Sequence, residues 1–157
     1  MLGAIAGNII GSVCEHRNIK KTQVPLFHPL RRFTDDTVQP VALAESILDG
    51  VSYPRLLICY YHVYLYTGYG EMFHKWVQSE SNRPYNSFEN GSAMRVSPVS
   101  YAYHSLEEVL TQAQRSAAVT HDHPEGIKGA QAVAAAIFLA RTGQSKERVE
   151  DYITTTF

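Results

Sequence analysis

Apolar residues recur at helical spacing along most of the chain, and short polar or turn-forming stretches separate the periodic segments. The spacing predicts helices over residues 2–15, 34–48, 53–66, 71–78, 106–120, 127–141 and 145–152. No stretch alternates between apolar and polar residues as a strand does, and no linker divides the chain. The pattern therefore predicts one all-α domain over residues 1–157.

A polar stripe lies on the otherwise apolar first helix. Asn8, Ser12 and Glu15 stand four and then three positions apart, so they share one helix face. Unpaired polar groups are costly to bury. This face must therefore meet water, a partner or a ligand, and exposure to water is the plainest interpretation.

Two adjacent carboxylates, Asp35 and Asp36, begin the helix predicted over 34–48. The hydroxyl of Thr34 can cap this helix by accepting a hydrogen bond from a first-turn N–H, and acids in a first turn are favoured by the helix dipole. Carboxylate and hydroxyl oxygens are also the ligands that Mg²⁺ or Ca²⁺ selects. Both interpretations stay open on spacing alone. Pro40, inside the same helix, is expected to kink its axis.

Two further stretches could carry chemistry. The run 86–92 is either an ordinary loop or a set of backbone amides that cradles an anion, with Arg95 nearby as a cation. The histidines of His121-Asp122-His123 could suggest zinc, but no fourth N or S ligand stands at a recognisable spacing. A turn and helix cap is the preferred interpretation, with His121 free to hydrogen-bond a bound group.

The bulk composition excludes some classes of partner. Fourteen basic and fifteen acidic side chains give a net charge of −1, which argues against electrostatic attachment to nucleic acid or an anionic membrane. Cys14 and Cys59 lie inside apolar runs, which predicts buried, reduced thiols in a cytoplasmic protein. The apolar N-terminal stretch lacks a basic leader and is too short to span a bilayer.

Four motifs, taken together and in order, resemble the ADP-ribosylglycohydrolase family, which includes the dinitrogenase reductase-activating glycohydrolases. The motifs lie at residues 3–15, 33–37, 90–95 and 121–130, so the resemblance runs from end to end of the chain. It implies an orthogonal all-α helical bundle with two Mg²⁺ (or Mn²⁺) ions. The implied activity is hydrolysis of the glycosidic bond between ADP-ribose and a protein side chain or small acceptor, so the implied partner is an ADP-ribosylated protein or a small ADP-ribose conjugate.

The resemblance also implies the residues of a site. The metal ligands would be Thr34, Asp35 and Asp36, and the two aspartates would act in catalysis with Glu15, the acid of a loop over the metals. The remaining residues would bind the substrate: Asn8, Ser87, Phe88, Asn90, Gly91, Ser92, Arg95 and His121.

The chain departs from the family in ways that predict an impaired site. The family completes its metal centre with an Asp-x-Asp-Thr motif far toward the C-terminus, and no such pattern follows residue 121. The three ligands that remain are too few for two hard cations. Asn8 replaces a usual Asp, and the carboxylate of Glu89 would repel a diphosphate. We therefore expect the N-terminal portion of the fold, incomplete at its C-terminus and weakly active or inactive; the alternatives are a non-catalytic module that binds ADP-ribose or a related nucleotide, and an inactive truncated remnant.

Overall fold

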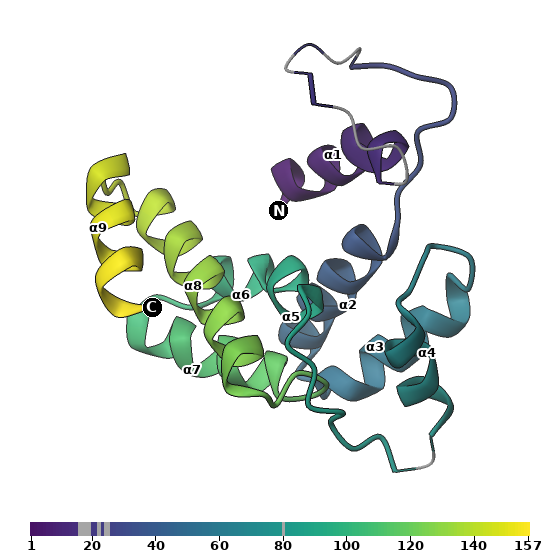
Figure 1. Cartoon of the computed structure of the whole chain (residues 1–157). Coiled ribbons are helices and arrows are strands. Elements are labelled where there is room, and N and C mark those ends of the chain that lie inside the picture. Colours follow the sequence, from purple (N-terminus) through teal and green to yellow (C-terminus); the bar gives the residue numbers. More distant parts are fainter. Residues whose placement is uncertain (16–19, 22, 24–25, 80) are drawn as a thin grey trace.

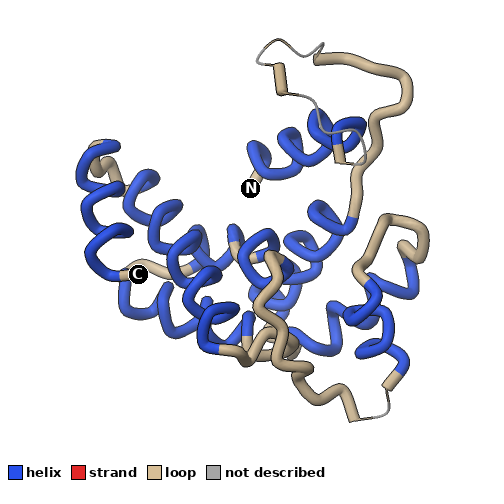
Figure 2. The backbone as a smooth tube through the Cα atoms, viewed as in Figure 1, coloured by secondary structure: helices blue, strands red, loops and turns tan. Residues whose placement is uncertain are grey.

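The structure is a computed structural model that describes residues 1–15, 20–21, 23, 26–79 and 81–157. Throughout these ranges the regular structure is helical, and none of the described residues forms a strand (Figure 2). The predicted all-α fold class is confirmed. Nor does any helix in these ranges have the length and hydropathy that a membrane crossing requires.

The helices follow one another in a simple order (Figure 1). They are α1 (Leu2–Gly11), a short 3-10 helix η1 (Ser12–Cys14), α2 (Asp35–Asp49), α3 (Tyr53–Val63), α4 (Glu71–Gln78), α5 (Gly91–Arg95), α6 (Ser97–Ala102), α7 (Leu106–Ala117), α8 (Pro124–Arg141) and α9 (Lys146–Thr156). The predicted first helix therefore ends earlier and tightens into a 3-10 turn, while α5 and α6 are short helices within a stretch for which periodicity predicted no long helix.

Two parts of the chain meet at α2. The helices α3 and α4 lie on one side of it, and α5 to α8 lie on the other, with α9 on the outer side of α8 (Figure 1). A continuous apolar core joins them. Its fully buried members include Ala42, Leu43, Val96, Val99, Val109, Ala113, Ala117, Ala130 and Ala134.

Local sequence explains where α7 and α8 begin. Ser105 caps α7 by accepting a hydrogen bond from the N–H of Glu108, whose carboxylate in turn accepts one from the N–H of Ser105. Pro124 begins α8, and His123 Nδ1 accepts a hydrogen bond of 3.1 Å from the N–H of Glu125. The predicted turn and cap at residues 121–126 is confirmed.

The exposure of the cysteines differs from the prediction. Both thiols are free, but Cys59 is exposed and Cys14 is only partly buried. Leu57 and Tyr61 occupy the buried face of α3, four positions apart. Cys59 lies midway between them and therefore points to the opposite face, so an apolar run did not imply burial of each of its members.

Core burial along α2 predicts a sharp contrast between two leucines. Replacement of Leu43, which is fully buried, by alanine is expected to lower the free energy of unfolding by about 2–5 kcal/mol, because it removes apolar contacts and leaves a cavity. Leu48 in the same helix is 83% exposed, so Leu48→Ala is the matched control, with an expected change within about 0.5 kcal/mol. Urea unfolding followed by circular dichroism measures both. Equal losses would contradict this placement of the core.

Candidate functional site

A side chain of α1 organises the N-terminus of α2. The amide oxygen of Asn8 accepts hydrogen bonds from the backbone N–H of Thr34 at 2.9 Å and from the hydroxyl of Thr37 at 2.6 Å. The amide nitrogen of Asn8 donates to Thr34 Oγ1 at 2.7 Å and, more weakly, to Asp36 Oδ2 at 3.4 Å. Asn8 therefore holds the start of α2 from outside the helix.

The predicted side-chain cap by Thr34 is wrong. Thr34 occupies the N-cap position, and its carbonyl accepts from the N–H of Thr37, but its hydroxyl accepts no hydrogen bond from α2. That hydroxyl is engaged elsewhere, because it accepts from Asn8 and donates to Glu15 Oε1 at 3.4 Å. The Thr34 hydroxyl therefore belongs to the cluster of acidic side chains.

The polar stripe of α1 meets the protein rather than water alone. Besides the contacts of Asn8, the Ser12 hydroxyl accepts a hydrogen bond from the N–H of Arg32 at 3.2 Å. Glu15 is exposed at the end of η1 and reaches Thr34. The stripe thus ties the first helix to the segment that leads into the acid pair.

The acid pair carries mutually repelling charges. Burial, and then the charges of Asp36 and Glu15, raise the pKa of Asp35 to about 7, against the lowering effect of its own backbone N–H and of Gln39. Burial, and then the charge of Glu15, also raises the pKa of Asp36. Both aspartates are thus made harder to ionise by a neighbouring carboxylate, and such a site is electrostatically suited to a cation.

In the part of the chain that the structure describes, no three His, Cys, Asp or Glu side chains converge as a metal-ligand group. A hard cation at Asp35 and Asp36 would therefore need further oxygens, from the Thr34 hydroxyl, from water or from a ligand.

A hollow of about 390 Å³ lies between α1, the start of α2 and α5. It is lined by Ala4, Gly7, Asn8, Gly11, Glu15, Asp36, Asn90 and Met94. Four of these residues, Asn8, Glu15, Asp36 and Asn90, are predicted site residues from three separate parts of the sequence. The fold therefore brings one carboxylate of the acid pair to the same opening as the loop around Asn90.

The loop 87–92, which we call the cradle loop, is anchored to the junction between α7 and α8. The N–H of Asn86 donates to Asp122 Oδ1 at 2.7 Å, and Ser92 Oγ donates to the carbonyl of Gly126 at 2.8 Å. Gly126 allows this approach, since a Cβ there would stand 2.5 Å from the carbonyl oxygen of Ser87. Two contacts from one junction thus set the position of the loop.

The members of the cradle loop differ in exposure. Ser87 and Ser92 are buried, whereas Phe88 and Asn90 are exposed, and the ring centroid of Phe88 lies 5.3 Å from that of His123. Ser87 Oγ accepts a hydrogen bond from the N–H of Glu89 at 3.2 Å. The serines therefore shape the loop, and its exposed members, Phe88, Glu89 and Asn90, are the ones that a ligand can reach.

The structure places Arg95 in the interior, away from the surface where the sequence predicted contact with a ligand. Its guanidinium is fully buried and donates to Gln39 Oε1 at 3.1 Å, to the carbonyl of Ser116 at 2.9 Å and to Thr120 Oγ1 at 2.7 Å. The short helix α5 turns inward because its neighbours Val96 and Val99 belong to the core. Burial lowers the pKa of Arg95 to about 10, so the group stays charged at neutral pH.

His121 lies behind the cradle loop. Its side chain is 2% exposed, and Nδ1 shares a hydrogen bond of 2.7 Å with Thr120 Oγ1. Burial, and then the charge of Arg95, lowers the pKa of His121 to about 4. The edge of its ring faces Gly91, where a Cβ would stand 2.9 Å from Cε1.

Sequence reasoning missed several residues that support the site. Gln39 donates to Asp35 Oδ2 at 3.3 Å, and its position four residues after Asp35 was a readable signal. Thr67, whose carbonyl accepts from the N–H of Asp35 at 2.9 Å, and Thr120 gave no such signal. Their contacts join segments that are far apart in the chain.

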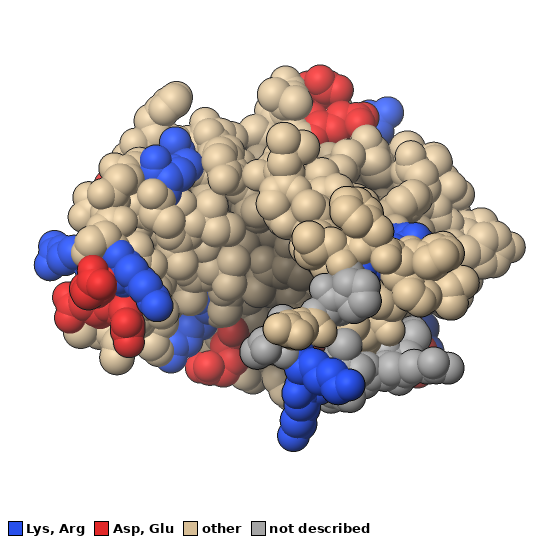
Figure 3. Space-filling view, turned by 90° about the horizontal axis from the view of Figure 1, so that it is seen from above, with Lys and Arg blue, Asp and Glu red and all other residues tan. Residues whose placement is uncertain are grey.

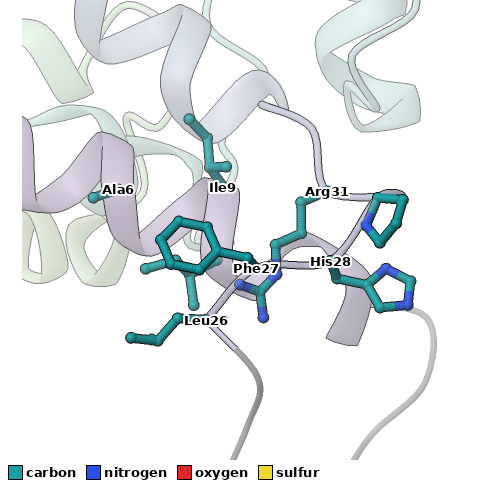
Figure 4. A pocket seen from close by; sticks show the side chains of 8 residues that line it. Ala6, Ile9, Leu26, Phe27, His28 and Arg31 are labelled. Atoms are coloured by element: carbon teal, nitrogen blue, oxygen red, sulfur yellow. The ribbon is translucent and has the colours of Figure 1, made fainter.

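A larger, mostly apolar pocket of about 740 Å³ lies on the other face of α1 (Figure 4). It is lined by Ala6, Ile9, Ile10, Leu26, Phe27, His28, Pro29 and Arg31, none of which is a predicted site residue.

In Figure 3 the face seen from above is recessed near its middle, and its charged side chains gather toward the edges. The described residues of that face form no broad basic surface.

The comparison with protein families agrees with the order of the motifs. The profile of the ADP-ribosylglycohydrolase family matches residues 1–157. The chain belongs to this family.

Named relatives are similar over most of the chain. ADP-ribosylhydrolase ARH3 of Xenopus tropicalis is 28% identical over 92% of the chain and 50% of its own length, and that of Bos taurus is 28% identical over 92% and 49%. The human ADP-ribosylhydrolase ARH3 is 30% identical over 72% of the chain and 36% of its own length. The chain thus spans about half the length of these curated relatives, or less.

Two glycines of α8 test the anchoring of the cradle loop. Gly126→Ala is expected to lower the free energy of unfolding by about 1–3 kcal/mol, because the new methyl group collides with the backbone at Ser87. Gly129 has open space at its Cβ position, so Gly129→Ala is the matched control and is expected to stabilise by about 0.5–1 kcal/mol. Thermal unfolding of both variants measures the difference. Equal effects would contradict the close contact at Gly126.

His121 is expected to make stability depend on pH. Its pKa is about 4 in the folded state, against 6.5 for an ordinary histidine, so the unfolded chain takes up the proton first as the pH falls. The contribution is complete above about pH 6.5 and is lost toward pH 4, by up to about 3 kcal/mol.

Urea unfolding of the wild type and of His121→Gln across this pH range measures the effect. The variant cannot titrate at this position, so the wild type should lose more stability than the variant as the pH falls. Parallel profiles would show that His121 is not held neutral.

Proposed function

We propose that this chain acts on ADP-ribose conjugates, and that its chemistry is hydrolysis of the glycosidic bond between ADP-ribose and a protein side chain or small acceptor. The observation that carries the proposal is the hollow where Asn8, Glu15, Asp36 and Asn90 meet. Membership of the ADP-ribosylglycohydrolase family supports the same chemistry.

The cradle loop is suited to the nucleotide part of such a conjugate. The exposed ring of Phe88 offers a flat apolar surface for a base or ribose, and the amide of Asn90 lies at the rim of the hollow. Buried Ser87 and Ser92 keep the loop in place, and Gly91 within the loop allows His121 to approach closely. The scissile bond would then lie toward Asp36 and Glu15.

The acid pair is suited to a Mg²⁺ or Mn²⁺ ion, which Asp35, Asp36 and the Thr34 hydroxyl would hold. When bound, such an ion would polarise ribose hydroxyls and lower the pKa of a water molecule. Glu15 is exposed beside this cluster and so can take a proton from water at the scissile bond. Asp36 would help stabilise positive charge that develops on the ribose.

The short donor set favours a second candidate function, a module that binds ADP-ribose without cleaving it. The described residues bring fewer oxygens to Asp35 and Asp36 than two hard cations need. We therefore propose that turnover by these 157 residues is weak. The exposed free thiol of Cys59 is compatible with a reducing compartment, and we propose a cytoplasmic location.

Glu15→Gln is the variant that tests the catalytic proposal. Wild-type protein with Mn²⁺ or Mg²⁺ is expected to release ADP-ribose from ADP-ribosylated arginine, and Glu15→Gln is expected to slow this release by about 100-fold, because it removes the proton acceptor. Glu107→Gln is the matched control, since Glu107 is an exposed carboxylate in the first turn of α7. Chromatography of released ADP-ribose measures both rates, and calorimetric titration measures binding.

The outcomes separate the candidate functions. Release that persists unchanged in Glu15→Gln, or in excess chelator, would contradict the proposed chemistry. Saturable binding of ADP-ribose without turnover would favour the binding module. Neither binding nor turnover would contradict both functions and leave the inactive remnant.

A further inference from the structure

The guanidinium of Arg95 lies between the two halves of the site. One amino group donates to Gln39, on the helix that carries the acid pair, and the other donates to Thr120, beside His121. A fully buried charge is costly, and the three acceptors of Arg95 are two neutral side chains and a carbonyl. Packing alone therefore does not explain why the guanidinium of Arg95 is buried at this place.

An arginine can only donate hydrogen bonds, and this fixes the direction of its neighbours' bonds. Because Gln39 Oε1 accepts from Arg95, the Nε2 end of Gln39 must face Asp35, to which it donates at 3.3 Å. The acid pair therefore receives a donor from this network.

The hydrogen bonds on the opposite side of Arg95 have a fixed direction as well. Thr120 Oγ1 accepts from the charged guanidinium of Arg95, which makes the hydroxyl a stronger donor and disfavours a second N–H directed at the same oxygen. The hydrogen of the Thr120 hydroxyl is therefore donated to Nδ1 of His121, 2.7 Å away. In a neutral imidazole that accepts at Nδ1, the hydrogen is on Nε2.

Nε2 of His121 is buried and has no hydrogen-bond partner among the described residues. It lies against Gly91 in the cradle loop, 3.1 Å from where a Cβ of that residue would stand. An unpartnered N–H at this place is suited to an acceptor oxygen, such as a hydroxyl or phosphate oxygen of a ligand in the loop.

We propose that Arg95 is a positioning residue that acts through Thr120 to hold His121 as its Nε2–H tautomer, a donor directed at the cradle loop. The group that His121 meets in a bound ligand is accordingly an acceptor oxygen. This assignment of a ligand rests on the proposed function, but the tautomer does not, because it is a property of the free protein.

Nitrogen NMR of the free protein tests the tautomer, with the His121 signals assigned by their loss in His121→Gln. The wild type and Thr120→Ser, which keeps the hydroxyl, are expected to show a protonated Nε2 and a bare Nδ1. Thr120→Val and Arg95→Met are expected to lose this preference, and Thr120→Val keeps the test available if Arg95→Met does not fold. A protonated Nδ1 in the wild type, or an unchanged tautomer in Thr120→Val, would overturn the proposal.

Calorimetric titration with ADP-ribose tests the consequence for binding. Thr120→Val is expected to bind about tenfold more weakly than wild type, as for the loss of one oriented hydrogen bond, and Thr120→Ser is expected to bind as wild type does. Equal affinity of Thr120→Val would overturn the positioning role. If the wild type itself does not bind ADP-ribose, the proposed function fails, and the tautomer measured in the free protein still decides whether Arg95 acts as proposed.

Discussion

The buried guanidinium of Arg95 is the interaction on which the rest of the site depends. It joins α2, the end of α5 and the end of α7 through hydrogen bonds to Gln39, Thr120 and the carbonyl of Ser116. Since a buried charge left without acceptors costs several kcal/mol, these segments are held in one arrangement. The acid pair and the cradle loop are attached to those same segments, so their relative positions follow from the same group.

The first helix supplies the second constraint. Asn8 satisfies the backbone N–H of Thr34 and the hydroxyl of Thr37, and so takes over the role that a capping side chain would have. The Thr34 hydroxyl is thereby released toward Glu15 and the carboxylates. One neutral amide thus orders an acidic cluster without adding to its charge. An Asp at the same position would add to the repulsion among the carboxylates.

The two halves of the site differ in what they offer a ligand. Asp35, Asp36 and Glu15 form a repelling cluster that a cation would stabilise. The cradle loop offers an exposed ring, an amide and, behind Gly91, the neutral His121. This division is suited to the proposed substrate, an ADP-ribose conjugate, whose glycosidic bond and nucleotide would lie in the two halves.

Most of the helical segments, the charge class and the position of the acid pair could be predicted from the sequence, because these depend on local spacing that periodicity and capping chemistry report directly. The order of four motifs also indicated the family, which the family comparison confirmed. The contacts between distant side chains could be seen only in the tertiary structure. Arg95 meets Gln39, 56 residues away, and Asn8 meets Thr34, 26 residues away. The burial of Arg95 and the exposure of Cys59 could not be predicted from the sequence, since both depend on which face of each helix the neighbouring elements cover. Local patterns specify an element and its faces, but the partner of each face is chosen by packing across the whole chain.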